Sequence, residues 1–167
     1  EPLKIAISPT LGGLPIDQGV LSVIDEARKT FSKLGAEVTL KDPPLEGAME
    51  CFQTQRAVGL RGLGNLLEKT IPNWREFAKD TATWNIEKGF GLTIEDMIRA
   101  EATRTRIFED ISEYFKDFDA LLLPAAQVPP FDLSQEWISE IEGIKLDTYI
   151  DWMSVCCMIT VTGLPAI

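Results

Sequence analysis

The sequence predicts an α/β fold, and three of its features support this. Residues 3–40 are patterned as strand, helix and strand, since an alternating apolar run precedes a helical apolar pattern and a second β-branched run. A helix of about fifteen residues between two strands suits a parallel crossover. The stretch 119–123, in which four apolar residues follow Asp119, is typical of a buried central strand, and residues 45–118 are patterned for helices. We therefore expect a βαβ unit at the start and a helix-rich middle.

The first strand is predicted where Leu3, Ile5 and Ile7 alternate with less apolar neighbours. A turn follows at residues 12–15. Its paired glycines could also suggest a phosphate-binding loop, but no Gly-Lys-Ser/Thr follows and a third spaced glycine is missing, so a turn is the better interpretation. Asp17 is placed to cap the next helix.

That helix is defined by apolar residues at helical spacing and should end at Gly35. Its apolar residues are Val20, Val23, Ile24, Ala27, Phe31 and Leu34. Val38 and Leu40 then supply a second strand, which stops before residues 42–44, Asp-Pro-Pro.

Two helical stretches are expected next, at 45–70 and from Pro72 to the glycines at 89 and 91. Three glycines in the first stretch favour close approach of another helix over a ligand site. They are Gly59, Gly62 and Gly64. The aromatic residues of the second stretch, with a leucine just after it, are expected in the core, and a substrate pocket is the alternative. The residues concerned are Trp74, Trp84, Phe90 and Leu92.

A third helix should begin at Thr93, because Asp96 three residues later completes a pattern resembling a capping box, and it should run to about residue 118. Arg104 and Arg106 lie on this helix. A solvated or salt-bridged helix face is the preferred interpretation of these arginines, and binding of a carboxylate substrate is the alternative.

The loop at 124–131 is the best structural candidate for a pocket wall, because ligands on open α/β sheets lie beyond the carboxyl ends of the strands. The acidic segment 137–145 is expected to be a surface loop or short helix. A last helix should be capped by Asp147 and ended by Gly163. Its apolar residues at helical spacing are Tyr149, Trp152, Met153, Cys156 and Cys157.

Composition limits the classes of function. The chain has 167 residues, a hydrophobic content of 45% and a formal net charge of −10, which fits a globular protein and disfavours binding to a nucleic-acid backbone. Three cysteines do not suggest a disulfide framework, and Cys51 is expected in the core. No export signal or membrane-spanning run is visible, so a cytoplasmic protein is expected. The sequence lacks histidine, which excludes Ser-His-Asp and Cys-His arrangements within this chain.

The segments at 102–118, 119–130 and 149–167, taken in this order, resemble the C-terminal part of the amidase signature enzymes. Residues 102–118 resemble a helix of that family, and 119–130, DALLLPAAQVPP, resemble its D-x-L-L-x-P-T-x-x-x-P strand and loop, with Ala125 where threonine is usual. Tyr-x-x-Trp-Met at 149–153, followed by ITVTGLPAI, resembles a later phrase. The family includes bacterial amidases and the A subunit of amidotransferases that act on misacylated tRNA. The resemblance implies one domain over 1–167, with a mixed sheet covered by helices.

The family's chemistry uses a Ser, cis-Ser, Lys triad, in which a neutral lysine acts through the bridging serine on the nucleophilic serine, and main-chain N–H groups hold the oxyanion. The sequence contains no Ser-Ser dipeptide, and its seven serines are isolated from one another. The resemblance places the triad upstream, so no catalytic residue is assigned in this chain. It implies a substrate-binding role for six residues, although a core position is the alternative for the tryptophan. They are Pro124, Ala125, Trp152, Thr160, Thr162 and Gly163.

The expected function is therefore that of the C-terminal part of an amidase, inactive alone and completed by an N-terminal catalytic portion that acts on a small-molecule amide. No cofactor or metal is implied, and neither a nucleic-acid nor a membrane partner is expected; association with a second copy stays open. A non-catalytic α/β binding or interaction module is the alternative, as is the amidotransferase role within the family. An independent hydrolase using paired carboxylates has no supporting residue spacing.

Overall fold

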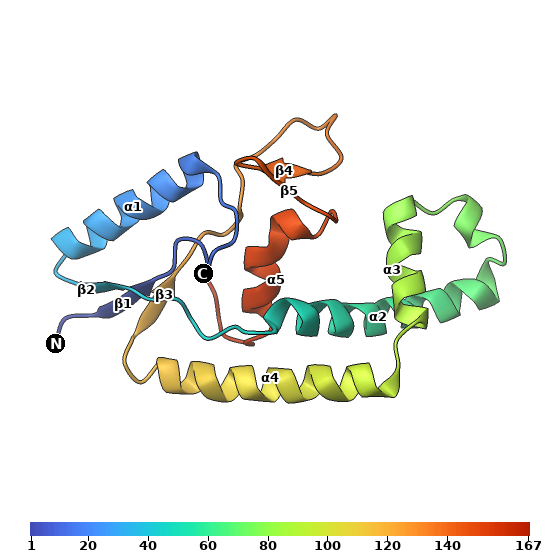
Figure 1. Ribbon diagram of the computed structural model, residues 1–167, viewed down its shortest axis with the longest axis horizontal. Coiled ribbons are helices and arrows are strands. Elements are labelled where there is room, and N and C mark those ends of the chain that lie inside the picture. The colour runs from blue at the N-terminus through green and yellow to red at the C-terminus, as the bar shows by residue number, and fades with distance from the viewer. The chain divides into compact units, whose positions relative to one another are not determined.

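The computed structural model describes residues 1–167, which form two compact units. The first unit comprises residues 1–46 and 107–167, and the second comprises residues 47–106. Figure 1 follows the elements along the chain, from β1 near the N-terminus to α5 near the C-terminus. Helix α4 (Ile94–Tyr114) begins in the second unit and ends in the first. The single domain expected over 1–167 stays a prediction.

The first unit contains a three-stranded parallel sheet with the strand order β2-β1-β3. The strands are β1 (Lys4–Ile7), β2 (Glu37–Leu40) and β3 (Ala120–Leu122). Ile7 of β1 is aligned with Leu40 on one side and with Leu122 on the other. The predicted βαβ unit is confirmed. The prediction that 119–123 forms a buried central strand is wrong for this sheet, because β3 pairs along one edge only and its side chains are half-buried or exposed.

Helix α1 (Gln18–Lys33) connects β1 to β2 and begins at the predicted cap. The Asp17 carboxylate accepts hydrogen bonds from the main-chain N–H groups of Gly19 and Val20, at 2.7 and 3.4 Å. Gly35 follows the helix with a φ of +91°, a left-handed conformation that glycine adopts without strain. The local sequence therefore predicted both the start and the end of this helix.

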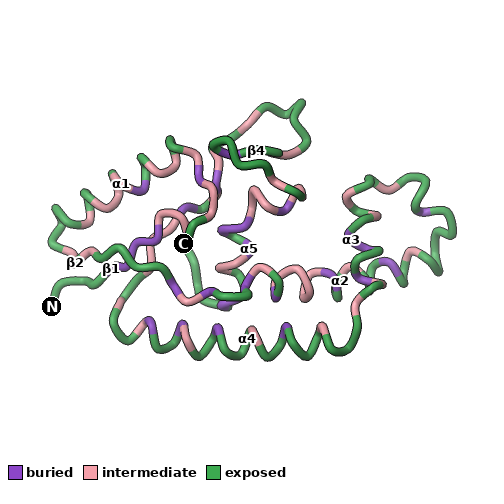
Figure 2. Tube along the Cα trace, in the orientation of Figure 1, coloured by how far each residue is buried: buried purple, intermediate pink, exposed green.

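One hydrophobic cluster of the first unit lies between α1 and the sheet. Ile5 and Ile7 of β1 and Ile24 of α1 form its buried centre. The partly buried residues packed against them are Phe31, Ala36, Val38 and Leu122. Figure 2 shows that β1 is mostly buried while most of α1 and β2 is intermediate or exposed. Val23 and Leu34, predicted on the apolar face of the helix, are exposed, because the sheet is narrow and covers only part of that face.

A buried tyrosine lies next to the carboxyl end of the sheet. The Tyr114 hydroxyl donates a hydrogen bond to the main-chain oxygen of Lys41, at 2.9 Å. Asp42 accepts a 2.6 Å hydrogen bond from the buried Ser8 hydroxyl. Burial, together with the nearby charge of Asp42, raises the pKa of Tyr114 to about 12. The neutral phenol is therefore favoured in the folded protein.

This raised pKa predicts a loss of stability at alkaline pH. An unfolded tyrosine ionises near pH 10, so the contribution of Tyr114 is complete below that pH and is lost as the pH rises toward about 12. We expect the free energy of unfolding to fall less steeply with pH in Tyr114→Phe than in the wild type over this window. Urea unfolding at a series of pH values measures the two slopes. Tyr149→Phe is the control, and equal slopes for wild type and Tyr114→Phe would contradict the prediction.

The second unit is helical. Its elements are α2 (Ala48–Thr70), the 3₁₀ turn η1 (Trp74–Glu76), α3 (Asp80–Phe90) and the first part of α4. The prediction that Pro72 opens a helix is wrong, because η1 makes a single turn and α3 begins only at Asp80. Contacts between elements shape this segment: Trp74 is buried, and Arg75 pairs with Glu68 of α2 and Glu87 of α3.

Helices α2 and α3 approach closely at Gly64. A Cβ atom at this position would lie 2.5 Å from Ile86 Cγ2 and 2.8 Å from Phe90 Cζ. The predicted use of a glycine for close helix contact is therefore confirmed at Gly64, whereas Gly59 and Gly62 face open space.

Gly89 makes the same contact from the side of α3. It was expected to end that helix, but it lies within α3, and a Cβ there would meet the main-chain oxygen of Ala57 and lie 2.9 Å from the main-chain nitrogen of Arg61. Gly91 provides the cap instead. The core interpretation of the aromatic residues holds for Trp74 but not for Trp84, which is exposed with Lys88 over its ring.

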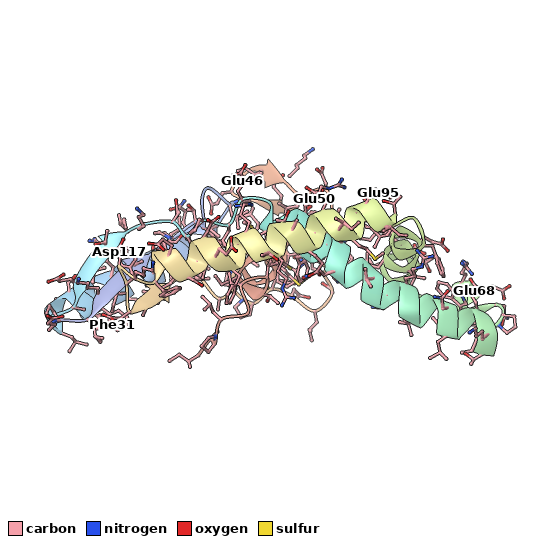
Figure 3. All side chains as sticks on the ribbon, turned by 90° about the horizontal axis from the view of Figure 1, so that it is seen from below. Phe31, Glu46, Glu50, Glu68, Glu95 and Asp117 are labelled. Carbon is pink, nitrogen blue, oxygen red and sulfur yellow. The ribbon has the colours of Figure 1, made fainter.

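Helix α4 begins at the predicted capping box. The main-chain N–H of Thr93 donates to the Asp96 carboxylate, and the main-chain N–H of Asp96 donates to the Thr93 hydroxyl. The helix ends at Tyr114, four residues earlier than expected, and Arg104 and Arg106 are exposed on it. Acidic side chains occur on several elements, as the labelled glutamates and aspartate of Figure 3 illustrate. No helix combines the length and apolar character needed to cross a bilayer.

The segment 137–145 forms a hairpin instead of the expected loop or helix. Its strands are β4 (Glu140–Ile141) and β5 (Ile144–Lys145). The two residues between them, Glu142 and Gly143, both have positive φ, at 50° and 79°, as the mirror-image turn of a tight hairpin requires. Glutamate is an unusual residue at such a position, which is why local sequence did not predict the turn.

Candidate substrate-binding site

Two segments of the first unit carry all the residues predicted to bind substrate. One is the loop 124–131, which follows β3 at the carboxyl end of the sheet. The other, 148–163, consists of the 3₁₀ turn η2 (Asp151–Met153), helix α5 (Ser154–Thr160) and the turn after it. We call the place where the loop contacts the start of this second segment the loop–helix junction.

The second segment starts differently from its prediction. Asp147 does not cap a helix; instead the Asp151 carboxylate accepts a 2.7 Å hydrogen bond from the main-chain N–H of Thr148. The Thr148 hydroxyl accepts one from the main-chain N–H of Ile150. The predicted cap at Asp147 is therefore wrong: neither η2 nor α5 has a side-chain cap, and η2 leads directly into α5.

Gln127 forms the polar part of the loop–helix junction. This residue is completely buried, with 0% of its surface exposed. Its side-chain Oε1 accepts a hydrogen bond from the main-chain N–H of Val155, at 3.3 Å, and its Nε2 donates one to the main-chain oxygen of Pro15, at 3.1 Å. Its main-chain oxygen accepts a 2.9 Å bond from the N–H of Asp17. One amide residue therefore joins the loop, the start of α5 and the segment before α1.

An aromatic pair forms the apolar part of the junction. The rings of Phe131 and Trp152 meet edge to face, with centroids 5.3 Å apart and an interplanar angle of 90°. The Trp152 Nε1 atom is buried and has no hydrogen-bond partner. Trp152 is half-buried, so the ring both packs on the loop and retains some exposed surface.

The six predicted residues fall into two groups. The junction joins the loop that carries Pro124, which is buried, and Ala125, which is exposed, to the element that carries Trp152. The other three, Thr160, Thr162 and Gly163, lie at the carboxyl end of α5, and their hydrogen bonds are local. They are exposed except Thr162, whose hydroxyl donates to the main-chain oxygen of Ile159 and accepts from the N–H of Leu164.

The polar hydroxyl and thiol groups of the chain have mainly structural surroundings. The Ser8 hydroxyl donates to Asp42, and those of Ser22, Ser112 and Ser154 donate to main-chain oxygens of their own segments. The three cysteines form no disulfide with one another, and burial raises the pKa of the Cys51 thiol. Cys156 is exposed one helical turn after Trp152, and no group of three potential metal-ligating side chains occurs together.

Sequence reasoning missed Gln127. The available signal was a lone amide inside the stretch LLLPAAQVPP, which is otherwise apolar. A polar residue in such a stretch is buried only if it is hydrogen-bonded, and this criterion points to a partner without saying which.

Comparison with known proteins identifies the family. A family model described as Amidase matches residues 1–167, the whole of the chain. The chain belongs to the amidase signature family. It is 28% identical over 155 residues to an acylamidase of Rhodococcus erythropolis, covering 90% of this chain and 32% of that protein. It is 26% identical over 182 residues to the A subunit of the glutamyl-tRNA(Gln) amidotransferase of Myxococcus xanthus (strain DK1622), covering 90% and 37%.

Solved amidase structures share the fold. A bacterial aryl acylamidase of the amidase signature family matches with a TM-score of 0.78 and 22% identity, over 97% of this chain and 35% of that one. A structure described as an amidase matches with a TM-score of 0.81 and 20% identity, over 98% and 37%. The α/β fold class is thus confirmed. The amidase chain described here spans about a third of the length of these relatives.

Proposed function

We propose that this chain forms part of the substrate pocket of an amide-bond hydrolase, and that residues outside it supply the Ser, cis-Ser, Lys triad and the oxyanion loop. One observation carries the proposal: all 167 residues match the amidase family, yet the seven serines are isolated from one another. The coverage of about a third of each relative agrees with it.

In this proposal the loop–helix junction shapes the acyl side of the pocket. Ala125 is exposed on the loop and Trp152 is half-buried on the facing element, so a small side chain and an aromatic ring are both available to an acyl group. Ala125 offers no hydroxyl where related enzymes carry threonine, so the contact there is apolar. Binding energy from such a wall positions the amide carbonyl against a nucleophile held elsewhere.

For substrate we propose amides with an apolar acyl group. The acylamidase relative supports this class, since its name describes cleavage of acyl amides and it is 28% identical over most of this chain. The apolar and aromatic character of the junction also suits an acyl or aryl group better than a charged one.

The test is hydrolysis of 4-nitroacetanilide, followed by the release of coloured nitroaniline. The complete protein that contains this chain is expected to turn the substrate over, and the 167-residue chain alone is expected to be inactive. Activity of the chain alone would contradict the assignment of the triad to other residues. No hydrolysis of any amide by the complete protein would favour the non-catalytic binding module.

The amidotransferase role is the second candidate, favoured by the 26% identity to the Myxococcus xanthus protein. The Tyr-x-x-Trp-Met phrase at 149–153, which resembles the stand-alone amidases, favours the hydrolase. The two differ in the fate of the acyl group and of ammonia. An amidotransferase component would release ammonia from glutamine only with its partner subunits and a misacylated tRNA, whereas the hydrolase needs neither.

A further inference from the structure

A fully buried amide at position 127 is unusual enough to need a structural reason. Removing an amide from water is unfavourable unless its donors and acceptors are paired, and here both ends of the side chain are paired, to Val155 and to Pro15. An apolar side chain of similar size would fill the same space without directional bonds. What the amide adds is a fixed distance and orientation between the segments that it joins.

Those segments are the two proposed walls of the pocket. Gln127 lies two residues after Ala125, and Val155 lies three residues after Trp152, so the bond between Gln127 Oε1 and the Val155 N–H connects one wall to the other. The edge-to-face contact of Phe131 with Trp152 connects them a second time, four residues further along the loop. Two connections restrain the loop against rotation as well as against separation.

The second end of the amide anchors this pair to the rest of the first unit. The Gln127 Nε2 bond to Pro15, and the main-chain bond from the Asp17 N–H to the Gln127 oxygen, attach the loop to the segment before α1. That segment follows the central strand β1 and leads into the cap of α1. The loop is therefore held to the segment before α1 on one side and to the start of α5 on the other.

We infer that Gln127 is a positioning residue that sets the separation between Ala125 and Trp152 and thereby the size of acyl group that the pocket accepts. The inference rests on the proposed function. Without the amide, the loop keeps its aromatic contact and its main-chain bond but loses the direct link to α5. Substrates then bind less tightly and are distinguished less well by acyl length, while the bond-breaking step, which occurs on other residues, changes little.

The test compares variants of the complete protein on 4-nitroanilides of increasing acyl length. Gln127→Met keeps the approximate shape and removes both side-chain hydrogen bonds. It is expected to raise KM about tenfold for the best substrate and to flatten the dependence of kcat/KM on acyl length. Gln127→Glu keeps an acceptor for the Val155 N–H, but only its protonated carboxyl can donate to the Pro15 oxygen, so it is expected to retain the wild-type order of substrates at low pH and to lose it as the carboxyl ionises.

Gly64→Ala controls for stability, because it disturbs the α2–α3 contact and not the junction. An unchanged acyl-length profile in Gln127→Met, or the same altered profile in Gly64→Ala, overturns the inference. If Gln127→Met does not fold, Gln127→Asn, whose shorter amide cannot reach both partners, replaces it with the same expected and contradicting results. A wild-type protein that hydrolyses neither an anilide nor any other amide refutes the proposed function instead, so the two failures are distinguishable.

Discussion

Replacement of Gly89 by alanine is expected to lower the free energy of unfolding by about 2 kcal/mol or more. The new methyl group would meet the main-chain oxygen of Ala57, and it would also crowd the main-chain nitrogen of Arg61. Main-chain atoms inside a helix cannot rotate away as a side chain can, so α2 and α3 would have to separate. Urea or thermal unfolding of the purified protein measures the loss.

Two glycines of the neighbouring helix α2 provide matched controls for Gly89. Gly59 and Gly62 have open space where a Cβ would be placed, so alanine there is expected to stabilise the protein by about 0.5–1 kcal/mol through its higher helix propensity. Gly64→Ala should destabilise it, because Ile86 Cγ2 lies in the way. Equal effects at 59, 62, 64 and 89 would show that helix propensity decides and that the close contact does not.

Replacement of Ile7 by alanine is expected to cost about 2–5 kcal/mol, the range for a large-to-small change in a packed core. Ile7 is 0% exposed, lies on the central strand and packs with Ile24 of α1. The lost methyl groups would leave a cavity, because the strands on both sides are held in register by main-chain bonds. Ile7→Val should cost about 1 kcal/mol, and chemical unfolding measures both changes.

The control is the residue aligned with Ile7 on the neighbouring strand. Leu40 is 63% exposed, so Leu40→Ala is expected to change the free energy of unfolding by well under half the Ile7→Ala value. A comparable loss at Leu40 would mean that its side chain is covered in the purified protein. Such a result would contradict the burial described for this sheet.

Much of the fold could be predicted because its signals are local. The alternation of apolar residues in β1, the Asp17 cap and Gly35 define the βαβ unit within about forty residues, and each is visible in a short window. Thr93 and Asp96 define the start of α4 in the same way, since both partners of the capping box lie within one turn.

The remaining features depend on partners that lie far apart in the sequence. Gln127 bonds to Pro15, 112 residues earlier, and to Val155, 28 residues later, so no local pattern could assign its role. Gly89 was expected to end α3 because glycine is common at helix ends. Its contact with Ala57 belongs to another helix, so the sequence around residue 89 does not reveal it. The substrate-binding role of the six residues assigned through the family resemblance stays a prediction. For three of them, the junction joins the loop that carries Pro124 and Ala125 to the element that carries Trp152.

The unequal exposure of the three cysteines has a practical consequence. Cys51 and Cys157 are buried, whereas Cys156 is exposed on α5, one turn from the ring that packs against the loop. Within this chain, a thiol-directed fluorophore would therefore attach at Cys156 in preference to the two buried cysteines. A change in its emission would report that a ligand is bound beside the junction. This readout needs no chromogenic leaving group, so binding could also be measured for amides whose cleavage gives no colour.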